Sequence, residues 1–140
     1  MRYSQQMSIR IAGLFAALAL AASVHAGDVK VSLTGSQEVP PVTTSATGAG
    51  SITVADDKSV SGSVTTKGVA AVAAHIHLAP AGKNGPPIIT LTKTSDDVWS
   101  VPEGSKLTDE QYAAFKAGSL YVNVHSAANK GGEIRGQLKP

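Results

Sequence analysis

Short stretches in which apolar and polar residues alternate are the feature that most constrains the fold of this chain. The first runs from Asp28 to Thr34, with Val29, Val31 and Leu33 alternating with polar residues. Four further stretches have the same pattern: 48–54, 60–64, 120–125 and 133–138. Each predicts a β-strand with one buried face. Turn-forming residues such as Asp56-Asp57-Lys58 separate them. The stretches 70–78, 88–91 and 98–101 are further expected strands. Seven or eight short strands separated by turns indicate an all-β fold, an antiparallel β-sandwich or flattened barrel.

One short helix is expected near residues 108–117. Thr108 is suited to cap its N-terminus, and Gln111 three residues later completes a capping box. Leu107 and Tyr112 stand where a hydrophobic staple would pair, and Gly118 is a natural stop. We expect the helix to cover one end of the sandwich.

The N-terminal 26 residues have the pattern of a secretory signal. Arg2 and Arg10 are basic, Ile11 to Ala22 is an unbroken apolar run, and Val24-His25-Ala26 suits a cleavage site. The run is shorter than the ~20 residues of a membrane span. We therefore expect a cleaved signal peptide over 1–26, with an uncleaved anchor as the alternative. A single domain over 27–140 would then be periplasmic or secreted, without membrane insertion.

Charge and composition narrow the range of partners. Without Arg2 and Arg10, ten Lys and Arg residues stand against ten Asp and Glu residues, so the mature chain is formally neutral. This balance gives no reason to expect a nucleic acid partner. The chain has no cysteine, and its two methionines, Met1 and Met7, lie in the expected signal. A metal site in the mature chain would have to use histidine and oxygen ligands.

The stretch Ala70 to Leu78 carries two histidines on one face of an expected strand. Val72, Ala74, Ile76 and Leu78 should form the inward face, and Ala71, Ala73, His75 and His77 the outward face. The later stretch Tyr121 to His125 has the same alternating pattern. Its Val122 and Val124 face inward with Leu120, and its Tyr121, Asn123 and His125 face outward.

These three outward histidines, His75, His77 and His125, are the candidate metal ligands. Side chains at i and i+2 of a strand stand ~6.6–6.8 Å apart on one face, so His75 and His77 can converge on one ion. His125 would join them if the two strands are neighbours. Three imidazoles with an open position suit Cu(II) or Zn(II). The alternative is that the imidazoles donate hydrogen bonds to carbonyls of the expected loop Pro80 to Pro87 and bind no metal.

Other outward residues are candidates for supporting roles or anion binding. Glu133 could be a ligand, an acceptor for a histidine N–H, or the partner of Arg135 in a surface ion pair, which is the default interpretation. Tyr121 and Asn123 share the face of His125 and would pack or hydrogen-bond beside it. We identify no Gly-rich phosphate loop, nucleophile elbow or paired carboxylates, so no catalytic residues are assigned.

Several motifs resemble the CHRD (chordin-type) domain family. They are Leu33-Thr34-Gly35-Ser36-Gln37-Glu38-Val39-Pro40-Pro41-Val42, Thr47-Gly48, Ala74-His75-Ile76-His77, Ala81-Gly82-Lys83-Asn84-Gly85, Tyr121-Val122-Asn123-Val124-His125 and Gly132-Glu133-Ile134-Arg135-Gly136-Gln137-Leu138. The family occurs in extracellular chordin and in small exported bacterial proteins. The resemblance implies an immunoglobulin-like β-barrel and no particular activity.

A weaker resemblance is to copper–zinc superoxide dismutase, a Greek-key sandwich with copper ligands on its outer face. His75, His77 and His125 would match copper ligands, and Arg135 the arginine that guides the anion. The bridging histidine, the rest of the zinc site and the disulfide have no counterpart here.

Three functions are therefore open at this point. The first is an exported protein that binds a transition metal, copper before zinc. The second is a metal-free structural or interaction module that binds another exported protein. The third is a redox enzyme of the dismutase type, although an enzyme is not the first expectation.

Overall fold

The computed structural model describes residues 27–140, so the expected signal peptide over 1–26 lies outside the described residues. Eleven elements follow one another along this part of the chain. They are β1 (Gly27–Thr34), the 3₁₀ turn η1 (Gly35–Gln37), β2 (Thr47–Val54), β3 (Val60–Lys67), β4 (Ala71–Leu78), β5 (Pro87–Thr90), β6 (Thr92–Ser95), β7 (Val98–Ser100), α1 (Asp109–Lys116), β8 (Leu120–Ser126) and β9 (Ile134–Leu138). Among these residues no helix is long and apolar enough to cross a bilayer.

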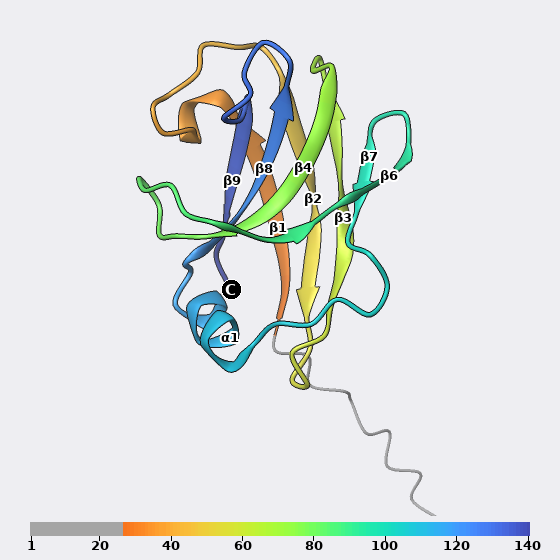
Figure 1. The fold of residues 1–140 in the computed structure, drawn as a ribbon, viewed down its shortest axis with the longest axis vertical. Coiled ribbons are helices and arrows are strands. Elements are labelled where there is room, and N and C mark those ends of the chain that lie inside the picture. The colour runs from red at the N-terminus through yellow and green to blue at the C-terminus, as the bar shows by residue number, and fades with distance from the viewer. Residues whose placement is uncertain (1–26) are drawn as a thin grey trace, which may run out of the picture.

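All nine strands belong to one curved antiparallel sheet (Figure 1). Its strand order is β5-β4-β8-β9-β1-β2-β3-β7-β6. The outermost strands, β5 and β6, are separated in sequence by Leu91 alone, whose N–H donates to Ala74 O at 2.9 Å. The sheet therefore nearly closes on itself, and the predicted all-β sandwich or flattened barrel with one short helix is confirmed.

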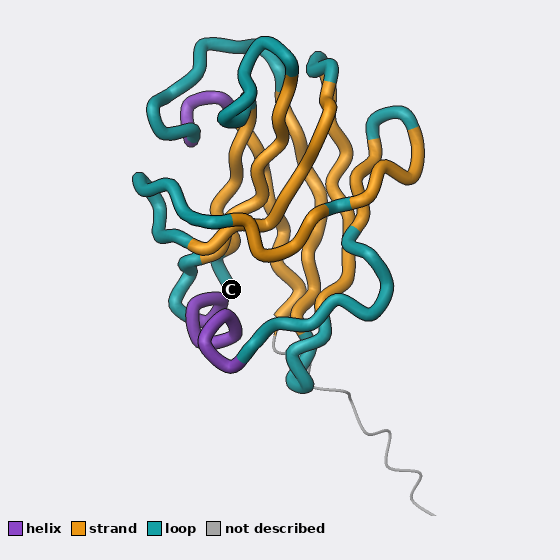
Figure 2. Tube along the Cα trace, in the orientation of Figure 1, coloured by secondary structure: helices purple, strands orange, loops and turns teal. Residues whose placement is uncertain are grey.

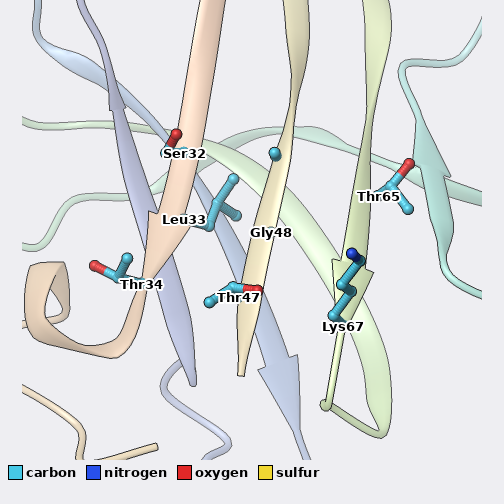
Figure 3. Close-up of a pocket in the computed structure, with 8 residues that line it drawn as sticks. Ser32, Leu33, Thr34, Thr47, Gly48, Thr65 and Lys67 are labelled. Carbon is cyan, nitrogen blue, oxygen red and sulfur yellow. The ribbon is translucent and has the colours of Figure 1, made fainter. Parts of the chain in front are cut away.

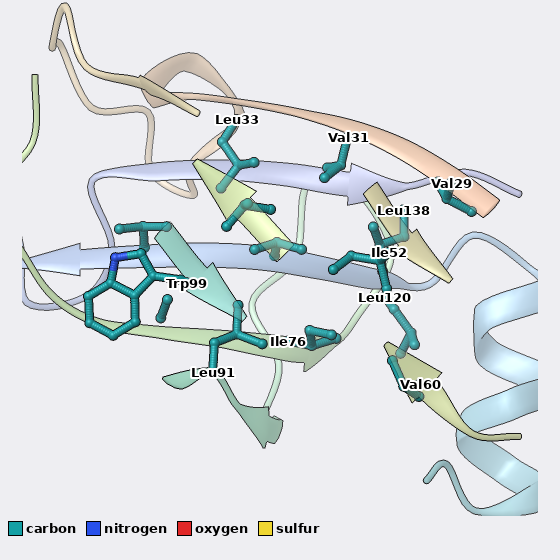
Figure 4. Close-up of a cluster of buried hydrophobic side chains, with 14 of the residues drawn as sticks. Val29, Val31, Leu33, Ile52, Val60, Ile76, Leu91, Trp99, Leu120 and Leu138 are labelled. Carbon is teal, nitrogen blue, oxygen red and sulfur yellow. The ribbon is translucent and has the colours of Figure 1, made fainter. Parts of the chain in front are cut away.

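The inward face of the sheet forms a continuous apolar core (Figure 4). Alternate residues of the predicted strands supply it, and Leu33, Ile52, Val64, Val122, Ile134 and Leu138 are fully buried. Trp99, the single tryptophan, closes one part of the core with 5 % of its surface exposed. Each such aliphatic side chain contributes about 1.5–3 kcal/mol by leaving water, so this core is the main source of stability.

Strand β4 departs from strict alternation at its start. Val72, predicted to face inward, is 63 % exposed, and Ala71, predicted to face outward, packs against the core. The register with β8 shifts between Ala71 and Ala73, which is the signature of a β-bulge. Because the bulge precedes the histidines, Ala74 and Ile76 still face inward as predicted.

The predicted helix and its cap are both present. Gln111 N–H donates to Thr108 Oγ1 at 3.2 Å, and Thr108 N–H donates to Gln111 Oε1 at 2.9 Å. Gly118 ends the helix with a φ of 74°, a conformation that glycine adopts without strain. The helix lies at the lower end of the barrel in Figure 1, where Phe115 is fully buried.

Replacing Thr108 by alanine is expected to lower the free energy of unfolding by about 1 kcal/mol, because the side-chain oxygen that accepts from Gln111 N–H is lost. Urea unfolding followed by Trp99 fluorescence measures this change. Thr92→Ala, on exposed β6, is the matched control and should change stability by no more than about 0.5 kcal/mol. Equal effects of the two substitutions would show that the cap contributes nothing.

The outward face differs between the two halves of the sheet. Over β1, β2 and β3 it is open to solvent and carries a shallow depression of about 350 Å³ lined by Ser32, Thr34, Thr47, Thr65 and Lys67 among others (Figure 3). Over β4, β8 and β9, by contrast, the outward side chains are covered. The loops in teal at the left and top of Figure 2 lie beside these strands.

Candidate metal centre

The three candidate ligands stand on neighbouring strands, as a common site requires. Strand β4 pairs with β8, with His75 opposite Asn123 and His77 opposite Tyr121. His125 lies opposite Ala73, two residues before His75. The period of two along each strand puts all these side chains on the outward face. Strand β9 adds Arg135 opposite Asn123 and Gln137 opposite Tyr121.

The histidine rings converge. One ring nitrogen from each of His75, His77 and His125 lies within 4.8 Å of the others. His75 Nδ1 is 3.0 Å from His125 Nε2, and the three ring centroids are 4.9 to 5.9 Å apart. A single transition-metal ion bound at ~2.0–2.1 Å from each nitrogen would fit this spacing with small side-chain movements.

Two main-chain carbonyls select the tautomers of two of the candidate ligands. His77 Nδ1 lies 2.8 Å from Gly85 O, and His125 Nδ1 lies 2.8 Å from Lys130 O. A carbonyl only accepts, so both Nδ1 atoms carry the proton and both Nε2 atoms keep a lone pair. His77 Nε2 is buried and has no hydrogen-bond partner among the described residues. An orphaned acceptor beside two other imidazoles is the arrangement that a metal ion would satisfy.

The environment keeps the imidazoles neutral. Burial is the main cause that lowers the pKa of His75, and the nearby His125 and His77 lower it further. Burial also lowers the pKa of His77, against the hydrogen bond to Gly85 O, which raises it. Neutral imidazole is the form that ligates metals, so both residues are in their binding form at neutral pH.

Three loops cover the outward face, and we name each by one residue. The Glu38 loop comprises residues 35–46, the Gly85 loop residues 79–86 and the Lys130 loop residues 127–133. His77 is only 9 % exposed beneath them. The outward direction predicted for the histidines is correct, but this face is largely hidden from solvent.

Gly85 is required where the Gly85 loop passes β4. A Cβ atom at this position would lie 1.9 Å from Leu78 O. The close approach brings Gly85 O to His77 and lets Gly85 N–H donate to Tyr121 Oη at 3.1 Å. A larger residue would push the loop away from the imidazole that it orients.

Arg135 holds the Gly85 loop in place through hydrogen bonds. It is 1 % exposed, and its terminal nitrogens donate to Lys83 O at 2.8 Å and Pro80 O at 3.1 Å. The guanidinium lies 3.5 Å from the centre of the Tyr121 ring, which is itself stacked on His77. Arg135 thus supports the loop and the aromatic side chain that contact His77, one of the candidate ligands.

The default interpretation of Glu133 and Arg135 as a surface ion pair is wrong. Both are buried, and the one salt bridge among the described residues joins Lys58 and Asp109. Glu133 instead accepts hydrogen bonds from Thr44 at 2.8 Å and Ser126 at 2.7 Å, which lower its pKa. Alternation predicted the face of each residue correctly but could not show that loops cover it.

Glu38 is a buried polar residue whose role the sequence did not reveal. It is 5 % exposed, and its Oε1 accepts a hydrogen bond from Asn123 Nδ2. Burial raises its pKa to about 7, against the nearby Arg135 charge and the Asn123 hydrogen bond, which lower it. Gly132 makes room for this pair, since a Cβ there would lie 2.2 Å from Asn123 Nδ2. The only signal was its position inside the motif Leu33 to Val42.

Comparison with known proteins identifies the family of this chain. The family model of the CHRD domain matches residues 29–138, a span that includes the three histidines, Glu38 and Arg135. No curated protein and no solved structure matched the chain. The match covers most of the sequence, so the chain belongs to the CHRD domain family.

Proposed function

We propose that this CHRD-domain protein is exported and binds one transition-metal ion, copper in the first place, through His75, His77 and His125. The observation that carries the proposal is the buried Nε2 of His77, which has no hydrogen-bond partner within residues 27–140 and lies beside two other imidazoles. The carbonyls of Gly85 and Lys130 fix the tautomers that leave the Nε2 atoms of His77 and His125 unprotonated, each with a lone pair for a metal ion. Export rests on the signal-like pattern of residues 1–26.

Copper is favoured over zinc by the chemistry of the donors. Residues 27–140 contain neither cysteine nor methionine, so the three candidate ligands offer only imidazole nitrogen. Cu(II) binds such nitrogen sites more tightly than Zn(II) does, as the Irving–Williams order states. Zinc is the second choice because three-histidine sites also serve it.

His75 must change tautomer if its Nδ1 is a ligand. His125 carries its proton on Nδ1, so His125 Nε2 accepts and His75 Nδ1 is the donor across their 3.0 Å contact. For Nδ1 of His75 to bind metal, its proton has to move to Nε2 or to solvent. Copper affinity should accordingly fall below about pH 6, where protons compete for the imidazoles.

Titration of the purified chain with Cu(II) tests the proposal. We expect one tight site in the wild type and a loss of affinity of at least about 100-fold in His77→Ala, which removes a ligand and its tie to Gly85. Lys130→Ala is the matched control, because it removes an exposed side chain next to the site and keeps the carbonyl that holds His125. Equal, weak binding by wild type and His77→Ala would remove the metal site.

A metal-free interaction module is the second candidate, and one contact favours it. The hydrogen bond between His75 and His125 satisfies two of the ring nitrogens without an ion. His77 and His125 are each also hydrogen-bonded to a loop carbonyl. In that case chelators should leave the thermal midpoint unchanged. Metal binding would instead raise stability by RT ln(1 + [L]/Kd), about 2.7 kcal/mol at 100 times Kd.

No observation favours a superoxide dismutase. The terminal nitrogens of Arg135, the residue expected to guide an anion, donate to Pro80 O, Lys83 O, Asn84 Oδ1 and Gln137 Oε1. Arg135 is also 1 % exposed, so its charge is not presented to an approaching anion.

A further inference from the structure

Glu38 is a buried carboxyl group that the histidine cluster does not use. Its Oε1 accepts from Asn123, and no described residue donates a hydrogen bond to its Oε2. Arg135 on β9 is the cation that faces it, and Lys139 lines the same cleft. An ionised carboxylate with so few donors is disfavoured when it is buried.

Protons can reach Glu38 while the protein stays folded. Glu38 lines two clefts, one of about 550 Å³ that Ala81 and Gly82 also line, the other of about 260 Å³ that Asn84 and Gly132 also line. Both clefts are open to solvent at the surface. Protonation and deprotonation therefore do not require global unfolding.

The Glu38 loop is tied to both loops that orient the ligands. Asn84 Nδ2 donates to Val39 O at 2.7 Å, which joins the Glu38 loop to the Gly85 loop. Thr44 Oγ1 donates to Glu133 Oε2 at 2.8 Å, and Glu133 Oε1 accepts from Asn129 of the Lys130 loop at 3.3 Å. The loops that supply Gly85 O to His77 and Lys130 O to His125 are thus both braced by the Glu38 loop.

From these contacts we propose that protonation of Glu38 holds the three loops closed over the outward face, and we call this arrangement the Glu38 latch. With a proton on Glu38, the carboxyl group is neutral, stays buried against Asn123 and keeps the Glu38 loop closed. Ionisation favours the open loop, in which the carboxylate is in water. Opening removes the contacts that hold Gly85 O and Lys130 O in place. The consequence for metal exchange rests on the proposed function, whereas the loop opening itself does not.

Among Glu38, Arg135 and Glu133, Glu38 is the group whose charge changes with pH in the required range. His77, which contacts the Gly85 loop, has a lowered pKa, so its titration acts in the opposite direction. Arg135 stays protonated, and hydrogen bonds from Ser126 and Thr44 lower the pKa of Glu133, which stays ionised. In the closed loop the pKa of Glu38 is about 7, against 4.5 in water. Opening should therefore become about tenfold more favourable for each pH unit between these values, and no more so above pH 7.

Hydrogen exchange of the metal-free protein at pH 5, 6, 7 and 8, corrected for intrinsic exchange, tests the latch. In the wild type, protection of the Glu38, Gly85 and Lys130 loops should fall by about 40-fold from pH 5 to 7, while β2 stays protected. In Glu38→Gln, which stays neutral, protection should remain at its pH 5 level throughout. Glu103→Gln, an exposed carboxyl on another loop, is the matched control and should behave as the wild type.

Asn84→Ala tests whether opening of the Glu38 loop is transmitted to the Gly85 loop. This variant removes the tie to Val39 O, so the Gly85 loop should lose its pH dependence while the Glu38 loop retains it. Protection that does not change with pH in the wild type would overturn the latch. So would an equal fall in Glu38→Gln. A Gly85 loop that still follows pH in Asn84→Ala would overturn the coupling.

A metal measurement then tests the consequence for the site. Transfer of bound Cu(II) to EDTA at pH 7.5 should be at least about tenfold slower in Glu38→Gln than in the wild type. Equal rates would overturn the control of metal exchange by Glu38. A protein that binds no copper would contradict the proposed function and leave the hydrogen-exchange result standing, so the two failures are distinguishable.

Discussion

Arg135→Met is expected to lower the free energy of unfolding by about 3–5 kcal/mol, the largest effect of any single substitution of a polar residue here. Methionine fills much of the same volume but donates no hydrogen bond. The main-chain carbonyl oxygens of Pro80 and Lys83 would lose their donor, and the Tyr121 ring would lose its cation. Removing the charge also leaves Glu38 without its facing cation.

Urea unfolding followed by Trp99 fluorescence measures this loss. Lys139→Met is the matched control, because it removes an exposed cation close in sequence and should change stability by no more than about 0.5 kcal/mol. If Arg135→Met does not fold, Arg135→Lys should show an intermediate loss, because an ammonium group cannot reproduce the planar fork. A loss below about 1 kcal/mol in Arg135→Met would mean that water replaces the guanidinium.

Glu38→Gln is expected to stabilise the protein at pH 8 by up to about 3 kcal/mol. The pKa of Glu38 is raised in the folded state to about 7 from 4.5. Its contribution to stability is therefore fully present below pH 4.5 and is lost as the pH rises through 7. Glutamine is neutral at every pH, so the variant should match the wild type near pH 4.5 and exceed it at pH 8.

The difference between the two proteins isolates Glu38 from other titrating groups. The lowered pKa values of His75 and His77 make their contribution fall in acid, the opposite trend, but they are common to both proteins. Urea unfolding at pH 5, 7 and 8 measures the difference, with Glu103→Gln as the control. A constant difference across these pH values would show that Glu38 is not the titrating group.

Strand content and the facing of the histidines could be predicted because both follow from local alternation. Val72 shows the limit of this rule, since a bulge that no residue type announces reverses the faces at the start of β4. The cover over the outward face is also non-local. Glu38 meets Asn123 across 85 positions of sequence, and Arg135 meets Lys83 across 52. In a loop without periodicity, nothing in the sequence indicates such partners.

The same limit applied to the chemistry of the site. The sequence left metal ligation and hydrogen bonding to the loop as alternatives, but the two nitrogens of one imidazole do different things. Nδ1 of His77 donates to Gly85 O, as the second alternative expected, while Nε2 remains available for the first. Only the positions of the carbonyls relative to the rings show that both interpretations can hold at once.

The pairing of the first strand with the last also bears on how the protein folds. Strand β1 lies between β2 and β9, so one of its two neighbouring strands is separated from it by roughly the whole domain. Such a high contact order predicts folding on the millisecond-to-second scale, with closure of a long loop as the costly step. Until residues 134–138 are available, β1 and β8 both lack a neighbour, so a growing chain cannot complete the barrel one piece at a time.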